Sequence, residues 1–200
     1  MEKKVKIVVL GGGFGGLTAA QSLDRYLRKN RNVEIILINK TPNQVYLTQL
    51  HEIAGNRIPD DGILYSLEAA LDQTRVKLVV DEINKIDVKN RRLYGVDNEY
   101  SFDYLILACG SEPAFFDIPG MKENAFTLWS HEDAVKIREH IVNMFELAST
   151  EEDAEKRKEY LTFVVGGGGY TGIEMIGELV EWVEDLCIDY NIKASEVSLM

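Results

Sequence analysis

The hydrophobic pattern of this chain contains one arrangement twice: an unbroken apolar run, then a cluster of glycines, then apolar residues at helical spacing. Near the N-terminus, Val5–Leu10 leads through the sequence VVLGGGFGG into a helical pattern over residues 14–29. Further along, Leu161–Val165 leads through FVVGGGGYTGIE into a helical pattern over residues 171–187. Because a continuous apolar run is typical of a strand covered on both faces, we predict strand, glycine turn and helix in both places.

The first arrangement continues into another apolar run, Val33–Asn39. Strand, helix and strand in this order form a unit whose strands are almost always parallel and joined by a right-handed crossover. Val76–Val80 and Tyr104–Ala108 predict two more strands, and we expect the second of these to return to the main sheet.

The segment between these last two strands, EINKIDVKNRRLYGVDNEYSFDY, predicts a meander of short strands. Turn signals at Lys89-Asn90 and Asp97-Asn98 separate them. Residues 41–74 are harder to interpret: TPNQVY is typical of a loop, and ILYSLEAALDQ should contain a short helix.

A domain boundary is expected within SEPAFFDIPG, residues 111–120, where two prolines and a glycine interrupt the pattern. Beyond it, Ser130 followed three residues later by Asp133 predicts a helix start, because both side chains can satisfy free amide hydrogens. The apolar face of this helix is predicted to consist of Ala134, Ile137, Ile141 and Met144. Residues 150–160 are highly charged and form a helix or a linker.

The helix over residues 171–187 should have one buried and one solvated side. The predicted buried side consists of Ile173, Ile176, Val180, Val183 and Cys187. The predicted solvated side is acidic and consists of Glu174, Glu178, Glu181 and Asp185. On the pattern alone, Glu174 is the first member of this solvated stripe, in a first helical turn that suits an acidic residue.

Together these elements predict an α/β protein with a Rossmann-like parallel sheet and a β-meander, followed by the first half of a second Rossmann-like unit. The predicted domains are residues 1–115 and 120–200. A further strand begins near Val197 in EVSLM, and the sequence stops at Met200. We therefore expect these 200 residues to be the front part of a longer protein, with both domains incomplete and little or no turnover on their own.

Composition narrows the function. The net charge of −11 argues against nonspecific binding to nucleic acid and against a basic membrane-surface patch. No apolar run reaches the roughly 18–20 residues that cross a bilayer, and the first residues lack the features of a signal peptide. Cys109 and Cys187 are too few for a disulfide scaffold, have no metal-ligand spacing and are expected to be small buried residues; no metal site is predicted.

The first glycine turn fits the pattern G-x-G-x-x-G with Gly11, Gly13 and Gly16. In this pattern the first glycine permits a tight turn, the second lets the backbone approach a pyrophosphate, and the third lets the helix lie close to the sheet. The helix N-terminus then offers free amide hydrogens to the phosphates. Since the motif follows a strand and opens a helix, nucleotide binding is favoured over a simple turn.

The acidic residue that normally meets the ribose hydroxyls should end the second strand, where this sequence has Asn39 and Lys40. An asparagine can still donate and accept hydrogen bonds, but it lacks the charge-assisted bond of a carboxylate. Lys40 could meet a phosphate or simply be a solvated strand end.

The second turn repeats the pattern with Gly167, Gly169 and Gly172. Two such turns imply two nucleotides in one chain, and two dinucleotides suggest electron transfer between them.

This arrangement resembles the two-dinucleotide-binding flavoproteins, which hold FAD at the first site and NAD(P)H at the second. Within that superfamily the chain most resembles the type II NADH dehydrogenases, the single-subunit NADH:quinone oxidoreductases. The resemblance is carried by VVLGGGFGG, INKTPNQVYLTQLHEIAG, FDYLILACGSEP and FVVGGGGYTGIEMIGEL. The Cys-x4-Cys of disulfide reductases is absent, since residues 41–74 contain no cysteine, so thiol relay chemistry is not expected.

The resemblance implies that residues 1–115 bind FAD and that residues 120–200 begin an NAD(H)-binding domain. The FAD pyrophosphate would lie on Gly11, Gly12, Gly13, Phe14, Gly15 and Gly16. The NADH pyrophosphate would lie on Gly167, Gly168, Gly169, Tyr170, Thr171 and Gly172. Asn39 and Lys40 would meet the adenosine ribose of FAD.

It also implies that Thr48 lies near the flavin, that Ile83 gives backbone contacts to adenine, and that Gly110 lines the adenosine side. Glu174 would sit close to the nicotinamide and the quinone entrance, which overturns the interpretation from the pattern alone.

The implied reaction passes hydride from NADH to FAD and electrons on to a quinone. The implied location is the cytoplasm, with the full-length protein peripheral on the cytoplasmic face of the membrane through a C-terminal region that this sequence lacks. A homodimer is possible. Two alternatives stay open: a soluble NADH oxidase or ferredoxin-type reductase of the same superfamily, and a non-catalytic nucleotide-binding module.

Overall fold

The computed structural model describes residues 4–200, which divide into two compact units. The first unit runs up to Tyr46 and resumes over Leu64–Ser111. The second unit consists of Leu47–Ile63 and Glu112–Met200. The chain therefore leaves the first unit, returns to it and leaves it again.

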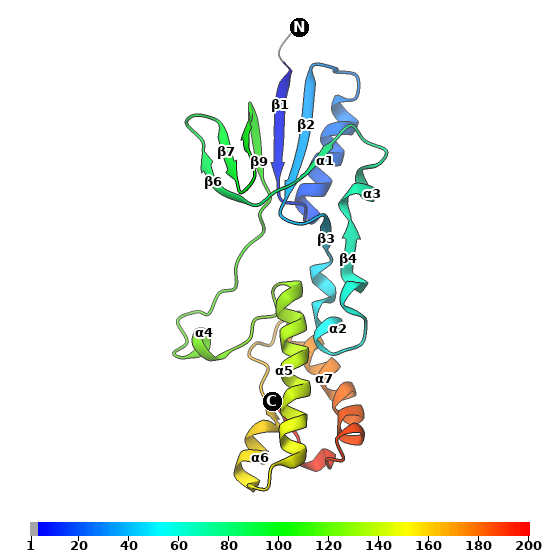
Figure 1. Cartoon of the computed structure of the whole chain (residues 1–200), viewed down its shortest axis with the longest axis vertical. Helices are drawn as coiled ribbons and strands as arrows, with labels where there is room; N and C mark the ends of the chain where they lie inside the picture. Colours follow the sequence, from blue (N-terminus) through cyan, green and yellow to red (C-terminus); the bar gives the residue numbers. More distant parts are fainter. Residues whose placement is uncertain (1–3) are drawn as a thin grey trace. The chain divides into compact units, whose positions relative to one another are not determined.

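The first unit is built on a four-stranded parallel sheet in the order β5-β2-β1-β9. The strands are β1 (Val5–Leu10), β2 (Val33–Asn39), β5 (Lys77–Val80) and β9 (Tyr104–Leu107). Helix α1 (Phe14–Leu27) connects β1 to β2 and lies against the sheet, as Figure 1 shows. The predicted strand–helix–strand unit and the return of the last strand to the sheet are both confirmed.

The apolar runs of β1 and β2 are continuous because each strand is covered on both faces. Alternate residues Val9, Ile35 and Leu37 pack with Ala20 of α1 and with Leu67, Leu71 and Val76. Their neighbours Val8, Leu10, Ile36 and Ile38 pack on the opposite face with Leu93 and Phe102. This division follows from the two-residue period of a strand.

The second of these faces is covered by the predicted meander. It consists of the antiparallel strands β6 (Ile83–Asp87), β7 (Arg92–Gly95) and β8 (Glu99–Ser101). Asp81, buried just before β6, accepts a hydrogen bond from Val96 N at 2.9 Å and one from the Tyr100 hydroxyl at 2.7 Å. The Tyr100 hydroxyl and the backbone amides hold the pKa of the Asp81 carboxyl below its ordinary value.

Residues 41–74 contain more structure than predicted. The loop TPNQVY includes the short strand β3 (Asn43–Val45), which pairs antiparallel with β4 (Leu64–Ser66). The predicted short helix is α3 (Leu67–Leu71), and Ser66 caps it by accepting a hydrogen bond from Ala69 N at 3.2 Å. Strand β3 was missed because a three-residue strand has no resolvable period.

The second unit is mostly helical. Its first segment comprises η1 (Leu47–Gln49), α2 (Leu50–Ala54) and η2 (Asp60–Ile63). Its second segment comprises α4 (Met121–Asn124), α5 (His131–Thr150), α6 (Ala154–Tyr160), β10 (Thr162–Phe163), α7 (Tyr170–Asp189), η3 (Ala194–Glu196) and β11 (Ser198–Leu199). Helix α2 packs against α5 and α7.

The predicted start of α5 is confirmed. The Ser130 hydroxyl accepts a hydrogen bond from Asp133 N at 3.1 Å, and the Asp133 carboxylate accepts one from Ser130 N at 3.2 Å. These two bonds form a capping box that satisfies two amides at the helix start. The charged residues 150–160 contain α6, which Asp153 caps by accepting hydrogen bonds from Glu155 N at 3.0 Å and Lys156 N at 3.4 Å.

The strand predicted over Leu161–Val165 is shorter than expected. Only Thr162 and Phe163 are in β10, which pairs in parallel with β11, and Val164 is 69% exposed. No helix in the described range 4–200 is both long enough and apolar enough to cross a membrane.

Helix α7 buries only part of the side that was predicted: Val183 and Cys187 are buried as expected. Ile173 and Val180 are exposed, whereas Glu178 is buried. The buried side consists of Met175, Glu178, Leu179, Trp182, Val183, Leu186 and Cys187. The prediction was wrong for Ile173, Val180 and Glu178 because α7 has apolar residues on two adjoining sides, and its packing against α2 and α5 selects the one that contains Trp182.

Candidate functional site

The first glycine turn lies between β1 and α1 and is shaped by close backbone approach. Gly11 has a φ of +106°, and a Cβ there would overlap the carbonyl oxygen of Ala108. A Cβ at Gly16 would overlap the carbonyl oxygen of Gly11. By contrast, a Cβ at Gly13 or Gly15 would meet no atom within 4 Å. The turn therefore needs some of its glycines for its own fold and leaves open space at the others.

Helix α1 begins with free amides. Gly13 is the N-cap residue, and no side chain caps the helix. Phe14, which is 43% exposed, packs edge-on against Tyr46 with ring centroids 4.9 Å apart. Uncapped amides beside open space are the arrangement that binds an anion at a helix N-terminus.

The side chain of Asn39 stabilises this turn by hydrogen bonding. Its carboxamide oxygen accepts a hydrogen bond from Gly12 N at 2.8 Å. Its amide nitrogen donates to Thr41 O at 2.9 Å and Asn43 O at 3.2 Å. A carboxylate could accept the first of these bonds but could not donate the other two. One lone pair of the oxygen is left for a ribose hydroxyl, so the predicted contact stays a prediction, and Lys40 beside it is exposed.

The second turn, between β10 and α7, repeats this geometry. Gly167 has a φ of +134°, and a Cβ at Gly172 would overlap the Gly167 carbonyl oxygen. A Cβ at Gly168 or Gly169 would meet no atom within 4 Å. Gly169 is the N-cap of α7, no side chain caps the helix, and the next residue, Tyr170, is 89% exposed. Thr171, in the same helical turn, is also exposed.

The other residues predicted to meet FAD are distributed over both units. Ile83 begins β6 and packs partly buried against the core of the first unit. Gly110 follows β9 with a φ of +77° and open space where a Cβ would lie. Thr48 is exposed in η1, which belongs to the second unit. Their predicted contacts with FAD stay predictions.

Glu174 lies in the second turn of α7, next to a histidine from α2. Its Oε2 is 3.6 Å from His51 Nδ1, and its side chain is 47% exposed. The other ring nitrogen, His51 Nε2, is 3.9 Å from Glu178 Oε1. The structure thus joins one predicted site residue, Glu174, to a histidine that the sequence pattern did not single out.

Glu178 is a buried carboxylate with a strong partner. Arg57 donates to its two oxygens, from Nε at 2.9 Å and from Nη2 at 2.8 Å. The Glu178 side chain is only 6% exposed, and Arg57 also reaches Glu181 at 3.5 Å. A bidentate guanidinium is the partner that best compensates a buried carboxylate.

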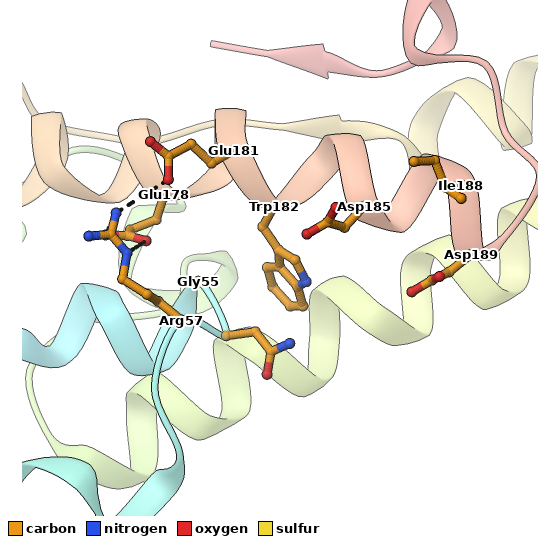
Figure 2. A pocket seen from close by; sticks show the side chains of 9 residues that line it. Gly55, Arg57, Glu178, Glu181, Trp182, Asp185, Ile188 and Asp189 are labelled. Atoms are coloured by element: carbon orange, nitrogen blue, oxygen red, sulfur yellow. Dashed lines mark hydrogen bonds and ion pairs between the residues drawn. The ribbon is translucent and has the colours of Figure 1, made fainter.

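A cavity of about 410 Å³ opens beside this pair (Figure 2). Its walls are Gly55, Asn56, Arg57, Glu178, Glu181, Trp182, Asp185, Ile188 and Asp189. Figure 2 shows the Arg57 guanidinium between the carboxylates of Glu178 and Glu181, with Trp182 further along the same helix. The Arg57–Glu178 pair therefore forms one end of an acidic cavity.

The two cysteines differ from each other. Cys187 is buried as predicted, and burial raises the pKa of its thiol. Cys109 is exposed, so its predicted burial was wrong. It follows β9 at the carboxyl end of the sheet, where its sulfur lies 3.8 Å from Leu10 O.

Sequence reasoning missed His51, Arg57 and the burial of Glu178. One signal was present: Glu174 and Glu178 are four positions apart, which places both on one side of a helix. Their partners come from a segment more than a hundred residues away, and no local pattern connects the two segments.

A sequence model of the family described as pyridine nucleotide-disulphide oxidoreductase matches residues 5–194. The chain is 35% identical over 198 residues to a type II NADH:quinone oxidoreductase of Staphylococcus epidermidis (strain ATCC 12228), covering 99% of this chain and 48% of that protein. It is 32% identical over 198 residues to the protein of the same description from Staphylococcus aureus (strain NCTC 8325), again covering 99% and 48%. The chain thus spans about half the length of these curated relatives.

Solved structures share the fold. NDH2 from Plasmodium falciparum, solved in complex with NADH, superposes with a TM-score of 0.85 at 22% identity, covering 98% of this chain and 41% of that one. NADH:rubredoxin oxidoreductase from Clostridium acetobutylicum gives a TM-score of 0.65 at 23% identity, covering 90% and 43%. The family match covers residues 5–194, and the parallel sheet and the two glycine turns of the structure agree with it. The chain therefore belongs to the pyridine nucleotide-disulphide oxidoreductase family.

Proposed function

We propose that the first glycine turn binds the pyrophosphate of FAD, that the second binds the pyrophosphate of NADH, and that the whole protein oxidises NADH and passes the electrons to a quinone. The observation that carries this proposal is the shared geometry of the two turns. In each, one glycine has a positive φ, another is pressed against that glycine's carbonyl, and the glycine that caps the helix faces open space.

The residues present fit a dinucleotide at both turns. An added Cβ at Gly13 or Gly169 would enter the space in which a pyrophosphate would lie. The amides at the start of α1 and α7 supply hydrogen-bond donors and the positive end of a helix dipole. When bound, FAD supplies the hydride-accepting chemistry, and the chain supplies position and electrostatics.

Glu174 is proposed to act near the nicotinamide and the quinone. It lies one turn into α7, close to the amides proposed to hold the NADH pyrophosphate, and its carboxylate is half exposed. Its exposed part can therefore contact a substrate, while its carboxylate also lies 3.6 Å from His51 Nδ1.

The quinone is the acceptor in the names of the relatives, which are 35% and 32% identical to this chain over 198 aligned residues. This similarity supports a quinone as the acceptor here as well. The location on a membrane face and the homodimer stay predictions.

Two single substitutions test the nucleotide sites on this chain. Gly13 and Gly169 have φ angles of −71° and −77°, which alanine adopts freely, and neither added Cβ would meet protein. We expect Gly13→Ala to weaken FAD binding about ten-fold or more and to leave NADH binding unchanged. We expect Gly169→Ala to do the reverse, and tenfold corresponds to about 1.4 kcal/mol.

Calorimetric titration of each nucleotide measures these affinities, and urea unfolding serves as the control. Both variants should be as stable as the parent or more so by about 0.4–1 kcal/mol, because alanine restricts the unfolded chain. Unchanged affinity for both nucleotides in both variants, measured on the whole protein as well as on this chain, would overturn the assignment of the turns.

The acceptor needs its own measurement on the whole protein. A quinone reductase bleaches its flavin with NADH and recovers it when a quinone is added without oxygen. A soluble oxidase or ferredoxin-type reductase recovers with oxygen or an iron–sulfur protein instead. A non-catalytic module shows no bleaching at all, and this outcome would refute NADH oxidation while leaving the binding measurements valid.

A further inference from the structure

His51 lies between two carboxylates that are one helical turn apart on α7. Its Nδ1 is 3.6 Å from Glu174, and its Nε2 is 3.9 Å from Glu178. The histidine side chain is only 14% exposed. Both of its ring nitrogens therefore face an acid, and the ring bridges a half-exposed carboxylate and a buried one.

The two carboxylates compete unequally for the ring proton. Glu178 already accepts both of its short contacts from the Arg57 guanidinium, at 2.9 and 2.8 Å, and Arg57 largely neutralises it. For Glu174, the described part of the chain provides no ion pair or hydrogen bond other than the contact with His51. A neutral imidazole has one N–H to donate, and the unneutralised acid at the shorter distance attracts it more strongly.

We propose that His51 carries its proton on Nδ1, facing Glu174, and acts as the positioning residue and proton carrier for that carboxylate. This inference rests on the proposed function, in which Glu174 is the group near the quinone. Glu178 and Arg57 hold the ring from its other side, since Glu178 is fixed by two bonds and its Cβ lies so close to Gly55 that a Cβ added there would be 2.5 Å from it.

The overall reaction takes up one proton from solvent, and such a carrier would deliver it. Reduction of a quinone to a quinol by NADH takes two electrons and two protons; NADH supplies both electrons and one proton as hydride, and the second proton comes from solvent. In the proposed step His51, neutral with its proton on Nδ1, takes up a solvent proton at Nε2, on the side that Glu178 lines. As that N–H bond forms, the Nδ1–H bond breaks and an O–H bond forms at Oε2 of Glu174, so the ring stays neutral. Loss of the Nε2 proton to solvent and uptake of a solvent proton at Nδ1 then restore the starting form.

The contact of 3.6 Å is longer than a hydrogen bond. Catalytic hydrogen bonds are often long in free enzymes and shorten in the substrate complex. Glu174, in the second turn of α7, and His51, on the short helix α2, need to approach by less than about one ångström to close it.

The tautomer of His51 can be measured on this chain without any nucleotide. Two-bond ¹H–¹⁵N correlation spectra at alkaline pH distinguish Nδ1–H from the Nε2–H form that solvated neutral histidines prefer. We expect Nδ1–H in the parent and Nε2–H in Glu174→Ala, which removes the acceptor. Glu184→Ala removes an exposed carboxylate of the same helix and should leave Nδ1–H in place. Nε2–H in the parent, or no change in Glu174→Ala, would overturn the proposal.

The proton-carrying role is tested on the whole protein with two acceptors. A quinone takes up protons, whereas ferricyanide takes up electrons only. We expect His51→Gln, which keeps an N–H donor but carries no proton, to lower quinone-linked kcat about a hundred-fold and to change ferricyanide-linked kcat less than two-fold. His140→Gln, a partly buried histidine on α5, is the matched control and should change neither rate.

Equal losses with both acceptors would mean that His51 is merely structural, and unchanged quinone reduction would mean that it carries no proton. A parent that oxidises NADH with neither acceptor overturns the proposed function and the proton-carrying step together. The tautomer spectra still decide separately whether His51 holds Glu174.

Discussion

Among single residues, the glycines of the two turns fall into two classes with different roles. A Cβ at Gly16 or Gly172 would overlap a backbone carbonyl oxygen, so these positions protect the approach of helix to strand. Gly13 and Gly169 face open space, so the fold does not need their lack of a side chain, which is proposed to make room for the nucleotides. Substitution by alanine should therefore distinguish the glycines that the fold needs from those that it does not need.

We expect Gly16→Ala to lower the free energy of unfolding by about 3 kcal/mol or more, because its Cβ forces α1 away from the Gly11 carbonyl. Gly15→Ala, one residue earlier in the same helix, has no atom within 4 Å of its Cβ and serves as the control. Urea unfolding followed by circular dichroism measures both. Equal unfolding midpoints would contradict the close approach.

The Arg57–Glu178 pair gives a second prediction for single residues. Arg57→Ala should lower the free energy of unfolding by about 1–3 kcal/mol, because it leaves a buried carboxylate without its cation, although Arg57 itself is half exposed. Arg92→Ala breaks an ion pair whose two side chains are 50% and 55% exposed, and should cost less than about 0.5 kcal/mol. Similar losses in the two variants would show that the burial of Glu178 has no energetic consequence.

Among elements, the meander depends on one carboxylate. Asp81 accepts hydrogen bonds from Val96 N and the Tyr100 hydroxyl, and these bonds lower its pKa below the ordinary 3.8. The stability that Asp81 adds is therefore fully present above pH 3.8 and is lost as the pH falls through the lower pKa of the folded state.

We expect Asp81→Asn to be less stable than the parent at pH 7 and the difference to shrink below pH 3.8. Urea midpoints at a series of pH values measure it. Glu68→Gln, an exposed acid of α3, should show no such convergence. A difference between Asp81→Asn and the parent that stays constant down to the lowest pH would mean that the hydrogen bonds to Asp81 do not depend on its charge.

Sequence patterns predicted the elements well where the pattern is compatible with only one local structure. Buried parallel strands read as unbroken apolar runs, and the glycines and the Ser130–Asp133 pair mark helix starts through local hydrogen bonding. Helix α7 has two apolar sides, so only its tertiary partners decide which one is buried. The same holds for the site: Gly167–Gly172 is a local motif, whereas the contact of His51 with Glu174 joins α2 to α7 and leaves no local signal.

For the whole molecule, each unit contains one of the two glycine turns. We expect FAD to slow amide hydrogen exchange chiefly in the first unit and NADH chiefly in the second. A ligand that binds only the closed state of a unit lowers the population of the open state from which its amides exchange. Exchange followed by mass spectrometry on peptides from each unit measures this. Adenosine, which lacks the pyrophosphate, is the matched control and should give little protection; protection of one unit by both nucleotides would contradict one site per unit.

The pairing of β3 with β4 has a consequence for how such a chain can be taken apart. Val45 and Leu64 are opposite each other in this ribbon, and everything between Tyr46 and Leu64 belongs to the second unit. The chain thus leaves the first unit and returns to it at adjacent positions of one two-stranded ribbon. A shortened gene that joins the end of β3 to the start of β4 through a tight reverse turn, and ends at Ser111, would encode the whole first unit as one continuous chain.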